Sequence, residues 1–255
     1  MLFDCHVHST ASPDGKMTAE EVIRLADKQQ MGIIFTEHVD LDPQGKPLFC
    51  VDFETYPREY VRYKSDKILL GIEIGLIPEC ADKNRSIAGN PDYDYILGSV
   101  HATDGIDIGY DPGSFFAEGT GCYARHLHCI LEMVKTNDFF DALGHIDYIS
   151  RYSPFIEKNV LYGDYAELYD EILTALIEGD KLLEFCSRRL GDGEARKNLF
   201  TIFSRYRDLG GRYVTLGSDA HVLEQLGYNF GTAIEMLDAI GLAPVYFNKR
   251  RMILC

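Results

Sequence analysis

Two histidines, His6 and His8, follow a short apolar run at the N-terminus of the chain, Leu2–Cys5. On an extended strand, side chains at positions i and i+2 point to the same face, so the two imidazoles can converge on one point. Histidine is the commonest metal ligand in proteins. The spacing therefore indicates a metal site at the end of a strand, although a core histidine beside a loop histidine would also explain this pair taken alone.

Other apolar runs along the chain also end in residues that can bind metals. Ile33–Phe35 leads to His38, and Ile68–Ile72 leads to Glu73. The residues at or just beyond the ends of such runs are His6, His8, Asp14, His38, Glu73, His101, His145, Asp219 and His221. This recurrence favours a shared metal centre over a chance placement of single histidines.

The types of these residues indicate which ions they would bind. Imidazole together with carboxylate favours Zn, Mn or Fe over Mg and Ca, which prefer oxygen ligands alone. The set is larger than one ion with an open position needs, so we expect two or three divalent metal ions (Zn, Mn or Fe). The two other histidines, His126 and His128, lie in a predicted helix over Cys122–Lys135 and are expected on its surface.

The elements that must position these residues alternate between short apolar runs and segments of helical periodicity, which predicts βαβ units and a parallel sheet. Helices are predicted after a capping box at Thr18–Glu21 and over Tyr56–Lys64, Cys122–Lys135, Tyr165–Ile177, Glu194–Leu209 and Thr232–Ile240, and a long loop over Val39–Phe53. Because nearly every strand ends in a polar residue, a closed barrel fits better than an open sheet with one switch point. We expect one α/β domain over residues 1–255, a distorted TIM-like (β/α)7 barrel with the metal site at its C-terminal mouth.

Composition narrows the class of protein. The 255 residues are 46% hydrophobic and 25% charged, as in a globular enzyme. The 7 cysteines are scattered without a C-x-x-C pair, which indicates a reducing cytoplasm. No apolar run approaches the roughly 18–20 residues that span a bilayer, and no signal peptide is recognisable. A net charge of −15 argues against nucleic acid. We expect a cytoplasmic protein without nucleic-acid or membrane partners, and the oligomeric state is left open.

The motifs taken together resemble those of the polymerase and histidinol phosphatase (PHP) family, a family of distorted barrels with two or three metal ions. The matching motifs are His6-x-His8, Thr36-Glu37-His38, Glu73, His101, His145 and Asp219-Ala220-His221. The resemblance extends from Leu2 to about His221. The segments Ile72–Pro78, Gly98–His101 and Gly144–Asp147 are most similar to the monofunctional histidinol-phosphatase branch.

The resemblance implies three sets of metal ligands. One ion would be held by His6, His8, Glu73 and Asp219, a second by Glu73, His101 and His145, and a third by Asp14, His38 and His221, with Glu73 bridging the first two. Position 14 is a histidine in some members of the family. Asp14 can replace it as a ligand and favours a harder ion.

The resemblance also implies a function, the metal-dependent hydrolysis of a phosphate monoester, most directly of L-histidinol phosphate to L-histidinol and phosphate in histidine biosynthesis. A hydroxide that bridges two ions would attack the phosphorus. Arginine binds phosphate oxygens bidentately, and Arg151 and Arg188 (or its neighbour Arg189) lie just beyond predicted strands, so they are the candidates for binding the substrate phosphate. Asp219 or His221 would protonate the leaving group.

Some residues depart from the family pattern. Cys186–Arg189 stands where the branch carries a small Asn-Thr-type segment. Because this loop helps to shape the substrate pocket, the identity of the substrate is left open. The alternatives are a PHP phosphoesterase acting on another small phosphate ester or a nucleotide, and a non-catalytic metal-binding regulatory protein, against which the intact ligand set argues. A carbon–nitrogen hydrolase would place a lysine at a strand end, where none stands. Glu37 either orients His38 or is solvated. Asp40 lies where an ammonium or imidazolium group of a substrate could dock, but a solvated loop is expected.

Overall fold

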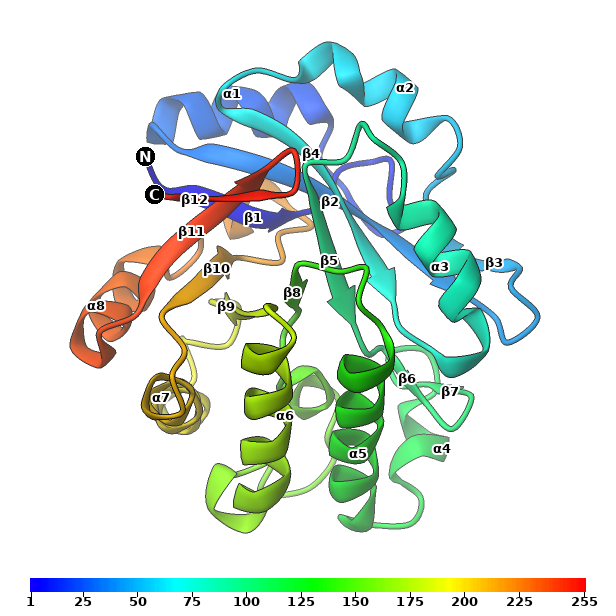
Figure 1. Cartoon of the computed structure of the whole chain (residues 1–255), viewed down its shortest axis with the longest axis vertical. Coiled ribbons are helices and arrows are strands. Elements are labelled where there is room, and N and C mark those ends of the chain that lie inside the picture. The colour runs from blue at the N-terminus through cyan, green and yellow to red at the C-terminus, as the bar shows by residue number, and fades with distance from the viewer.

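The computed structural model describes residues 1–255 and contains one large curled sheet whose strands follow chain order (Figure 1). Its strands are β1 (Phe3–Val7), β2 (Gly32–Leu41), β4 (Ile68–Gly75), β5 (Tyr95–Ser99), β8 (Ala142–Leu143), β9 (Leu182–Cys186), β10 (Tyr213–Gly217), β11 (Ala243–Asn248) and β12 (Arg251–Leu254). Neighbours from β1 to β11 pair in parallel, and β12 pairs antiparallel with β11. The predicted α/β fold with a parallel sheet is confirmed.

Helices connect successive parallel strands and cover the outside of the sheet (Figure 1). They are α1 (Ala19–Gln29), α2 (Tyr56–Tyr60), α3 (Ala81–Ala88), α4 (Pro112–Phe116), α5 (Gly121–Thr136), α6 (Ala166–Glu178), α7 (Gly193–Asp208) and α8 (Phe230–Ile240), with short 3-10 turns η1 (Val61–Tyr63), η2 (Pro78–Cys80), η3 (Tyr148–Arg151), η4 (Tyr162–Asp164) and η5 (Leu223–Gln225). The predicted capping box is confirmed, because the Thr18 N–H donates to Glu21 and the Thr18 hydroxyl accepts from the Glu21 N–H. No helix is both long and apolar enough to cross a membrane.

The predicted loop over Val39–Phe53 is wrong in part. Strand β2 continues to Leu41, and β3 (Pro47–Cys50) folds back to pair antiparallel with it. The connecting turn explains the loop-like composition, because the Asp42 carboxylate accepts hydrogen bonds from the N–H groups of Gln44 and Lys46. Tight turns favour such Asp and Gly residues, whereas the pairing itself depends on the neighbouring strand. A second small sheet pairs β6 (Ala102–Thr103) with β7 (Ile106–Asp107).

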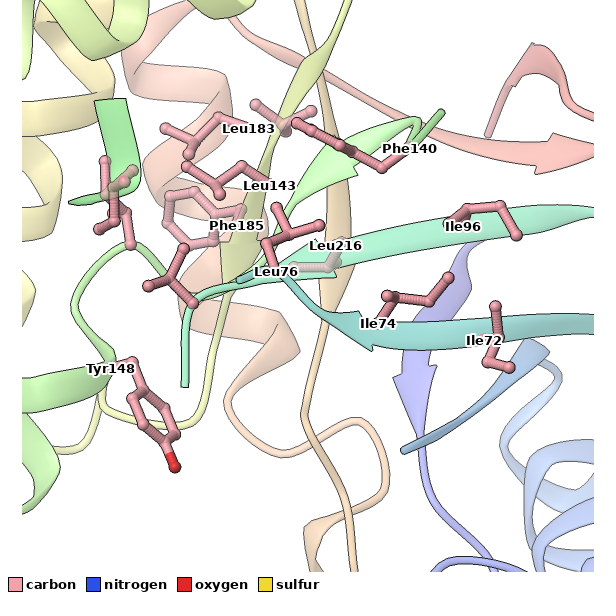
Figure 2. Close-up of a cluster of buried hydrophobic side chains, with 14 of the residues drawn as sticks. Ile72, Ile74, Leu76, Ile96, Phe140, Leu143, Tyr148, Leu183, Phe185 and Leu216 are labelled. Atoms are coloured by element: carbon pink, nitrogen blue, oxygen red, sulfur yellow. The ribbon is translucent and has the colours of Figure 1, made fainter. Parts of the chain in front are cut away.

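Side chains alternate along the strands between two hydrophobic clusters, one on each face of the sheet. Ile72 and Ile74 of β4, with Leu76 just beyond it, belong to the large cluster between sheet and helices, together with side chains such as Leu183 and Phe185 (Figure 2). The opposite face of the strands contributes a smaller cluster made of Phe3, Cys5, Ile34, Leu69, Tyr95, Leu97, Ala142 and Phe247. Because side chains alternate with a period of two, Glu73 lies on the same face as Leu69. The polar residues therefore extend the inner face toward the C-terminal strand ends.

The sheet returns on itself where β1 meets β10, and side-chain hydrogen bonds replace most of the ladder there. One parallel bridge joins Val7 to Ala220. The buried Asp4 carboxylate accepts hydrogen bonds from the Ser218 N–H at 2.9 Å, the Ser218 hydroxyl at 2.5 Å and the Gly227 N–H at 3.0 Å. Burial raises the pKa of Asp4 to about 6 even though these donors oppose the rise. Asp4 thus joins β1 to the segment that follows β10.

We predict that Asp4→Asn lowers the free energy of unfolding by about 1–3 kcal/mol, because an amide nitrogen cannot accept the hydrogen bonds of the buried N–H groups. Urea unfolding followed by circular dichroism measures the change. The matched control is Asp66→Asn, at an exposed position before β4. Equal stability of the Asp4 and Asp66 variants would contradict a closing role for Asp4.

Candidate metal centre

The C-terminal ends of the parallel strands meet at one mouth, and the structure brings all the predicted ligands together there. His6 lies in β1 and His8 just beyond it. His38 and Glu73 lie near the ends of β2 and β4, and His101 and His145 follow β5 and β8. Asp219 and His221 follow β10, and Asp14 lies in the loop after β1. Most of these side chains are buried, while that of Asp14 is 41% exposed. The centre is therefore a deep polar cluster with one open side.

In the first predicted set, both histidines lie close to one oxygen of Glu73 and one oxygen of Asp219. The Nε2 atom of His6 lies 3.3 Å from Glu73 Oε2 and 3.6 Å from Asp219 Oδ1. The Nε2 atom of His8 lies 3.5 Å from the same two oxygens. Asp219 adopts the left-handed backbone conformation, with φ of 54°, which is uncommon for a non-glycine residue and concentrates at functional sites.

The second set gathers around the other oxygen of the same carboxylate. Glu73 Oε1 lies 2.9 Å from His145 Nε2 and 3.2 Å from His101 Nε2, and these two nitrogens are 3.4 Å apart. The Ser99 hydroxyl donates a hydrogen bond to Oε1 at 2.6 Å. The two oxygens of Glu73 thus face two different groups of histidines, as a bridging ligand would.

The third set lies on the open side. His221 Nε2 is 2.9 Å from Asp14 Oδ2, and His38 Nε2 is 3.7 Å from Asp14 Oδ1. The two Nε2 atoms are 3.4 Å apart. The Nδ1 atom of His38 lies 2.9 Å from Glu73 Oε2, so this ring stands between the third set and Glu73.

These separations fit the requirements of a metal. In a tetrahedral site with bonds of about 2.0–2.2 Å, ligand atoms stand about 3.3–3.6 Å apart, close to most of the separations in the first two sets. Several of the converging atoms are buried and have no hydrogen-bond partner, among them His6 Nε2, His8 Nε2 and Glu73 Oε2. Buried polar atoms normally have partners. The residues present therefore fit two or three divalent ions, and their individual roles as ligands stay a prediction.

The ionisation of the central carboxylates also suits cations. Burial alone would raise the pKa of Glu73, but His6, His101 and His38 together hold it well below its usual range. Burial is likewise outweighed at Asp219, where Arg151 and His6 hold the pKa well below its usual range. Both groups are therefore negatively charged near neutral pH.

Glu37 does not contact the imidazole of His38, the first of its two predicted roles, and it is not solvated. Its buried carboxylate accepts hydrogen bonds from the Ser9 hydroxyl at 2.5 Å, the Ser12 hydroxyl at 2.6 Å and both of their N–H groups at 3.1 Å. The Ser12 oxygen in turn accepts from the His38 N–H at 3.0 Å. Glu37 therefore holds the loop that leads from His8 to Asp14.

Two further buried carboxylates were missed as part of the site, Asp40 and Glu184. The expected solvated loop around Asp40 is wrong, since Asp40 is buried at the end of β2 and contacts His101. Glu184 is buried in β9 and contacts His6. A sequence signal existed for each: Asp40 follows His38 by two residues on one strand face, and Glu184 interrupts an apolar strand, where a carboxylate needs a partner.

Arg151 lies against the first set of residues. Its Nη1 donates to Asp219 Oδ2 at 2.5 Å, its Nη2 lies 3.6 Å from the Cys186 sulfur, and its Nε is buried without a partner. The guanidinium also stands over the ring of Tyr148, a member of the buried hydrophobic cluster in Figure 2, at 5.4 Å. The Arg151 guanidinium is thus a positive charge held in place beside the metal centre, with its Nε free to donate a hydrogen bond. This arrangement suits the binding of an anion.

The two arginines after β9 differ in position. Arg188 Nη1 donates to the Asp219 carbonyl at 2.5 Å and lies 3.2 Å from His221 Nδ1, with 31% of the side chain exposed. Arg189 instead forms an ion pair with Asp147 at 2.8 Å and is largely buried. Of the two, only Arg188 faces the centre.

The expected surface position of His126 is wrong, whereas His128 is exposed. His126 is buried on α5, with its Nδ1 2.9 Å from the Thr103 hydroxyl and its ring edge-on to Phe115. Burial lowers the pKa of His126 to about 3. The segment that carries Thr103 and Phe115 folds back over α5, and this covers a helix face that the periodicity alone leaves open.

Comparison with known proteins identifies relatives of the whole chain. Residues 4–188 match the family model described as the PHP domain. A protein of Clostridium acetobutylicum named "Probable histidinol-phosphatase" is 38% identical over 253 residues, which cover 99% of each chain. A protein of Lactococcus lactis subsp. lactis named "Histidinol-phosphatase" is 27% identical over 230 residues, 87% of this chain and 85% of that one.

A solved structure shares the fold. The crystal structure of histidinol phosphate phosphatase from Lactococcus lactis subsp. lactis, complexed with Zn, L-histidinol and phosphate, superimposes with a TM-score of 0.88 and 24% sequence identity, covering 99% of this chain and 98% of the other. The similarity confirms the predicted TIM-like α/β architecture over the full length of the chain.

Proposed function

The chain belongs to the PHP domain family, and from this we propose that it is a metal-dependent phosphatase that hydrolyses L-histidinol phosphate to L-histidinol and phosphate. The observation that carries the proposal is the position of Glu73, whose two oxygens face two separate histidine groups with Arg151 nearby. The names of the full-length relatives support the choice of substrate. The whole chain, 1–255, is proposed to be a single PHP-type domain.

We propose that the ions are divided among the three ligand sets, with Zn, Mn or Fe as candidates. His6, His8, Glu73 and Asp219 would hold the first, Glu73, His101 and His145 the second, and Asp14, His38 and His221 the third. Such ions lower the pKa of coordinated water and neutralise charge on the phosphate. The Zn in the related Lactococcus lactis structure supports zinc as the first ion to test.

The residues of the chain would then act on the substrate itself. Arg151 is proposed to bind phosphate oxygens through its free Nε donor, while Asp219 holds the other side of the guanidinium. Because the pKa of Asp219 lies well below its usual range, Asp219 stays ionised near neutral pH. This favours His221 over Asp219 as the group that protonates the leaving alcohol.

A steady-state assay tests the proposal directly. The protein is loaded with Zn or Mn and supplied with histidinol phosphate beside several other phosphate monoesters, including a nucleotide. We expect kcat/KM to be highest for histidinol phosphate and activity to disappear after chelation and return on adding metal. A higher kcat/KM for another ester would identify that ester as the substrate. No turnover by metal-loaded protein would favour the non-catalytic alternative.

Cys186–Arg189, the segment at the end of β9 that departs from the family pattern, is expected to affect substrate binding through Arg188. We predict that Arg188→Met raises KM roughly 5-fold with little change in kcat, since a partly exposed ion pair contributes about 1 kcal/mol. Arg189→Met is the contrasting variant, because Arg189 pairs with Asp147 and should affect thermal stability rather than KM. Unchanged KM in Arg188→Met would remove this residue from substrate binding.

We also propose a cytoplasmic location, with a small phosphorylated metabolite as the ligand. All seven cysteines are free, as is usual in a reducing compartment. The acidic net charge of −15 argues against nucleic acid as a partner.

A further inference from the structure

We propose that Asp40 and Glu184 are positioning residues, each of which orients one histidine of the metal centre and thereby tunes a different ion. The inference rests on the proposed metal centre and names residues that the ligand sets do not include. It concerns binding of the metals and is independent of which phosphate ester is hydrolysed.

Asp40 acts on the second set. Its Oδ1 lies 2.8 Å from His101 Nδ1, whereas its Oδ2 lies 3.8 Å from His38 Nδ1, too far for a hydrogen bond, and all three groups are buried. A carboxylate oxygen accepts hydrogen bonds, so this contact assigns the donated proton to Nδ1 of His101. The unprotonated or metal-binding position is then Nε2, which lies 3.2 Å from Glu73 Oε1.

Glu184 has the same relation to the first set. Its Oε1 lies 2.6 Å from His6 Nδ1, which leaves His6 Nε2 to face Glu73 Oε2 at 3.3 Å. Its other oxygen, Oε2, accepts from the His145 N–H at 2.7 Å. One buried carboxylate thus fixes a ring in the first set and the backbone of a residue in the second.

Neighbouring glycines make room for both carboxylates. A β-carbon at Gly75, at the end of β4, would overlap the Asp40 carboxylate, and one at Gly217, at the end of β10, would overlap the Glu184 carboxylate. Neither glycine has the left-handed backbone that would by itself require glycine. Close approach to the carboxylates, and at Gly217 also to the β-carbon of His6, is therefore the physical reason for glycine at both strand ends.

The other histidines of these two sets lack such a partner. His8 Nδ1 faces the neutral Ser12 hydroxyl at 3.4 Å, and His145 Nδ1 is buried without a hydrogen bond. A carboxylate behind an imidazole raises its basicity as a metal ligand and fixes its orientation, and losing one typically weakens metal binding about 10–100-fold. Each of these two sets therefore contains one histidine with a carboxylate behind it: His6 in the first set and His101 in the second.

Stepwise metal binding tests the assignment without any substrate. The metal-free full-length protein is titrated with Co²⁺ against a competing chelator, and visible absorption of the bound Co²⁺ follows each step. We expect Asp40→Asn to weaken one step about 10–100-fold and Glu184→Gln to weaken a different step most strongly. Asp66→Asn, exposed before β4, is the matched control and should titrate like the wild type.

A second variant distinguishes loss of the Asp40 contact from a folding defect caused by replacing Asp40. Gly75→Ala leaves Asp40 in the chain but displaces its carboxylate, so it should weaken the same step as Asp40→Asn. Unchanged titrations in the Asp40 and Glu184 variants would overturn the proposal. Equal weakening of every step in both variants would also overturn it, since that marks a general loss of structure. Loss of a whole equivalent of Co²⁺ in Asp40→Asn would overturn it too, because Asp40 would then be a ligand itself.

The same titration separates this inference from the proposed function. Selective weakening by Asp40→Asn and Glu184→Gln would support the positioning roles even if histidinol phosphate proved a poor substrate. A wild-type protein that binds no Co²⁺ would contradict the metal centre and the positioning roles together.

Discussion

Glu73→Gln is expected to reduce kcat/KM by about 10³-fold or more and to lower the number of ions bound. Metal ions typically contribute several kcal/mol to a hydrolytic transition state, and each 1.4 kcal/mol corresponds to about tenfold in rate. The loss should be large because the two oxygens of one side chain face both the His6 group and the His145 group. Glutamine keeps the shape but removes the charge that these imidazoles surround.

Metal content measured by mass spectrometry, beside the steady-state rate, checks this expectation. Ser99→Ala is the informative companion, since it removes only one hydrogen bond to Glu73 and should cost about tenfold or less. Wild-type activity and full metal content in Glu73→Gln would contradict the bridging role. A variant that binds all its ions but lacks activity would place Glu73 in the chemical step instead.

Arg151→Met is expected to lower kcat/KM by about 10²–10³-fold, the usual effect of removing a donor that stabilises transition-state charge. Arg151 is fixed between Asp219 and the Tyr148 ring, and its Nε has no partner. Arg151→Lys should recover only part of the activity, because an ammonium cannot offer two parallel hydrogen bonds. Inhibition by inorganic phosphate should weaken in the same order.

The competing explanation is that Arg151 serves only to hold Asp219. Metal content distinguishes the two roles, since a phosphate-binding arginine can be lost while the ions stay bound. If Arg151→Met loses an ion and its remaining activity keeps the wild-type inhibition constant for phosphate, the contribution of Arg151 to phosphate binding is refuted.

Much of the centre was predictable because its sequence signals are local. The i, i+2 spacing of His6 and His8 places both side chains on one face of a strand, whatever the rest of the chain does. Each apolar run ends in a polar residue, and parallel strands align these ends at one mouth. The ligand-type residues could therefore be collected before their separations were known.

The errors arose where a residue's surroundings come from distant segments. Val39–Phe53 has the composition of a turn, and only the pairing of β3 with β2 turns part of it into sheet. His126 lies on a helix whose predicted outer face is covered by Phe115 and Thr103. Burial of this kind depends on packing between elements, which periodicity within one helix does not report.

Spacing along the chain was enough to infer the main alternation of strands and helices, the strand ends that carry His, Asp and Glu, and the family to which these motifs are similar. Contacts between distant segments appear only in the folded chain: Glu184 contacts His6 across 178 positions, Asp40 contacts His101 across 61, and Arg188 rather than Arg189 faces the centre. Such contacts require the sheet to curl until β9 and β10 lie beside β1, and the curvature arises from packing over the whole domain, which no local pattern encodes.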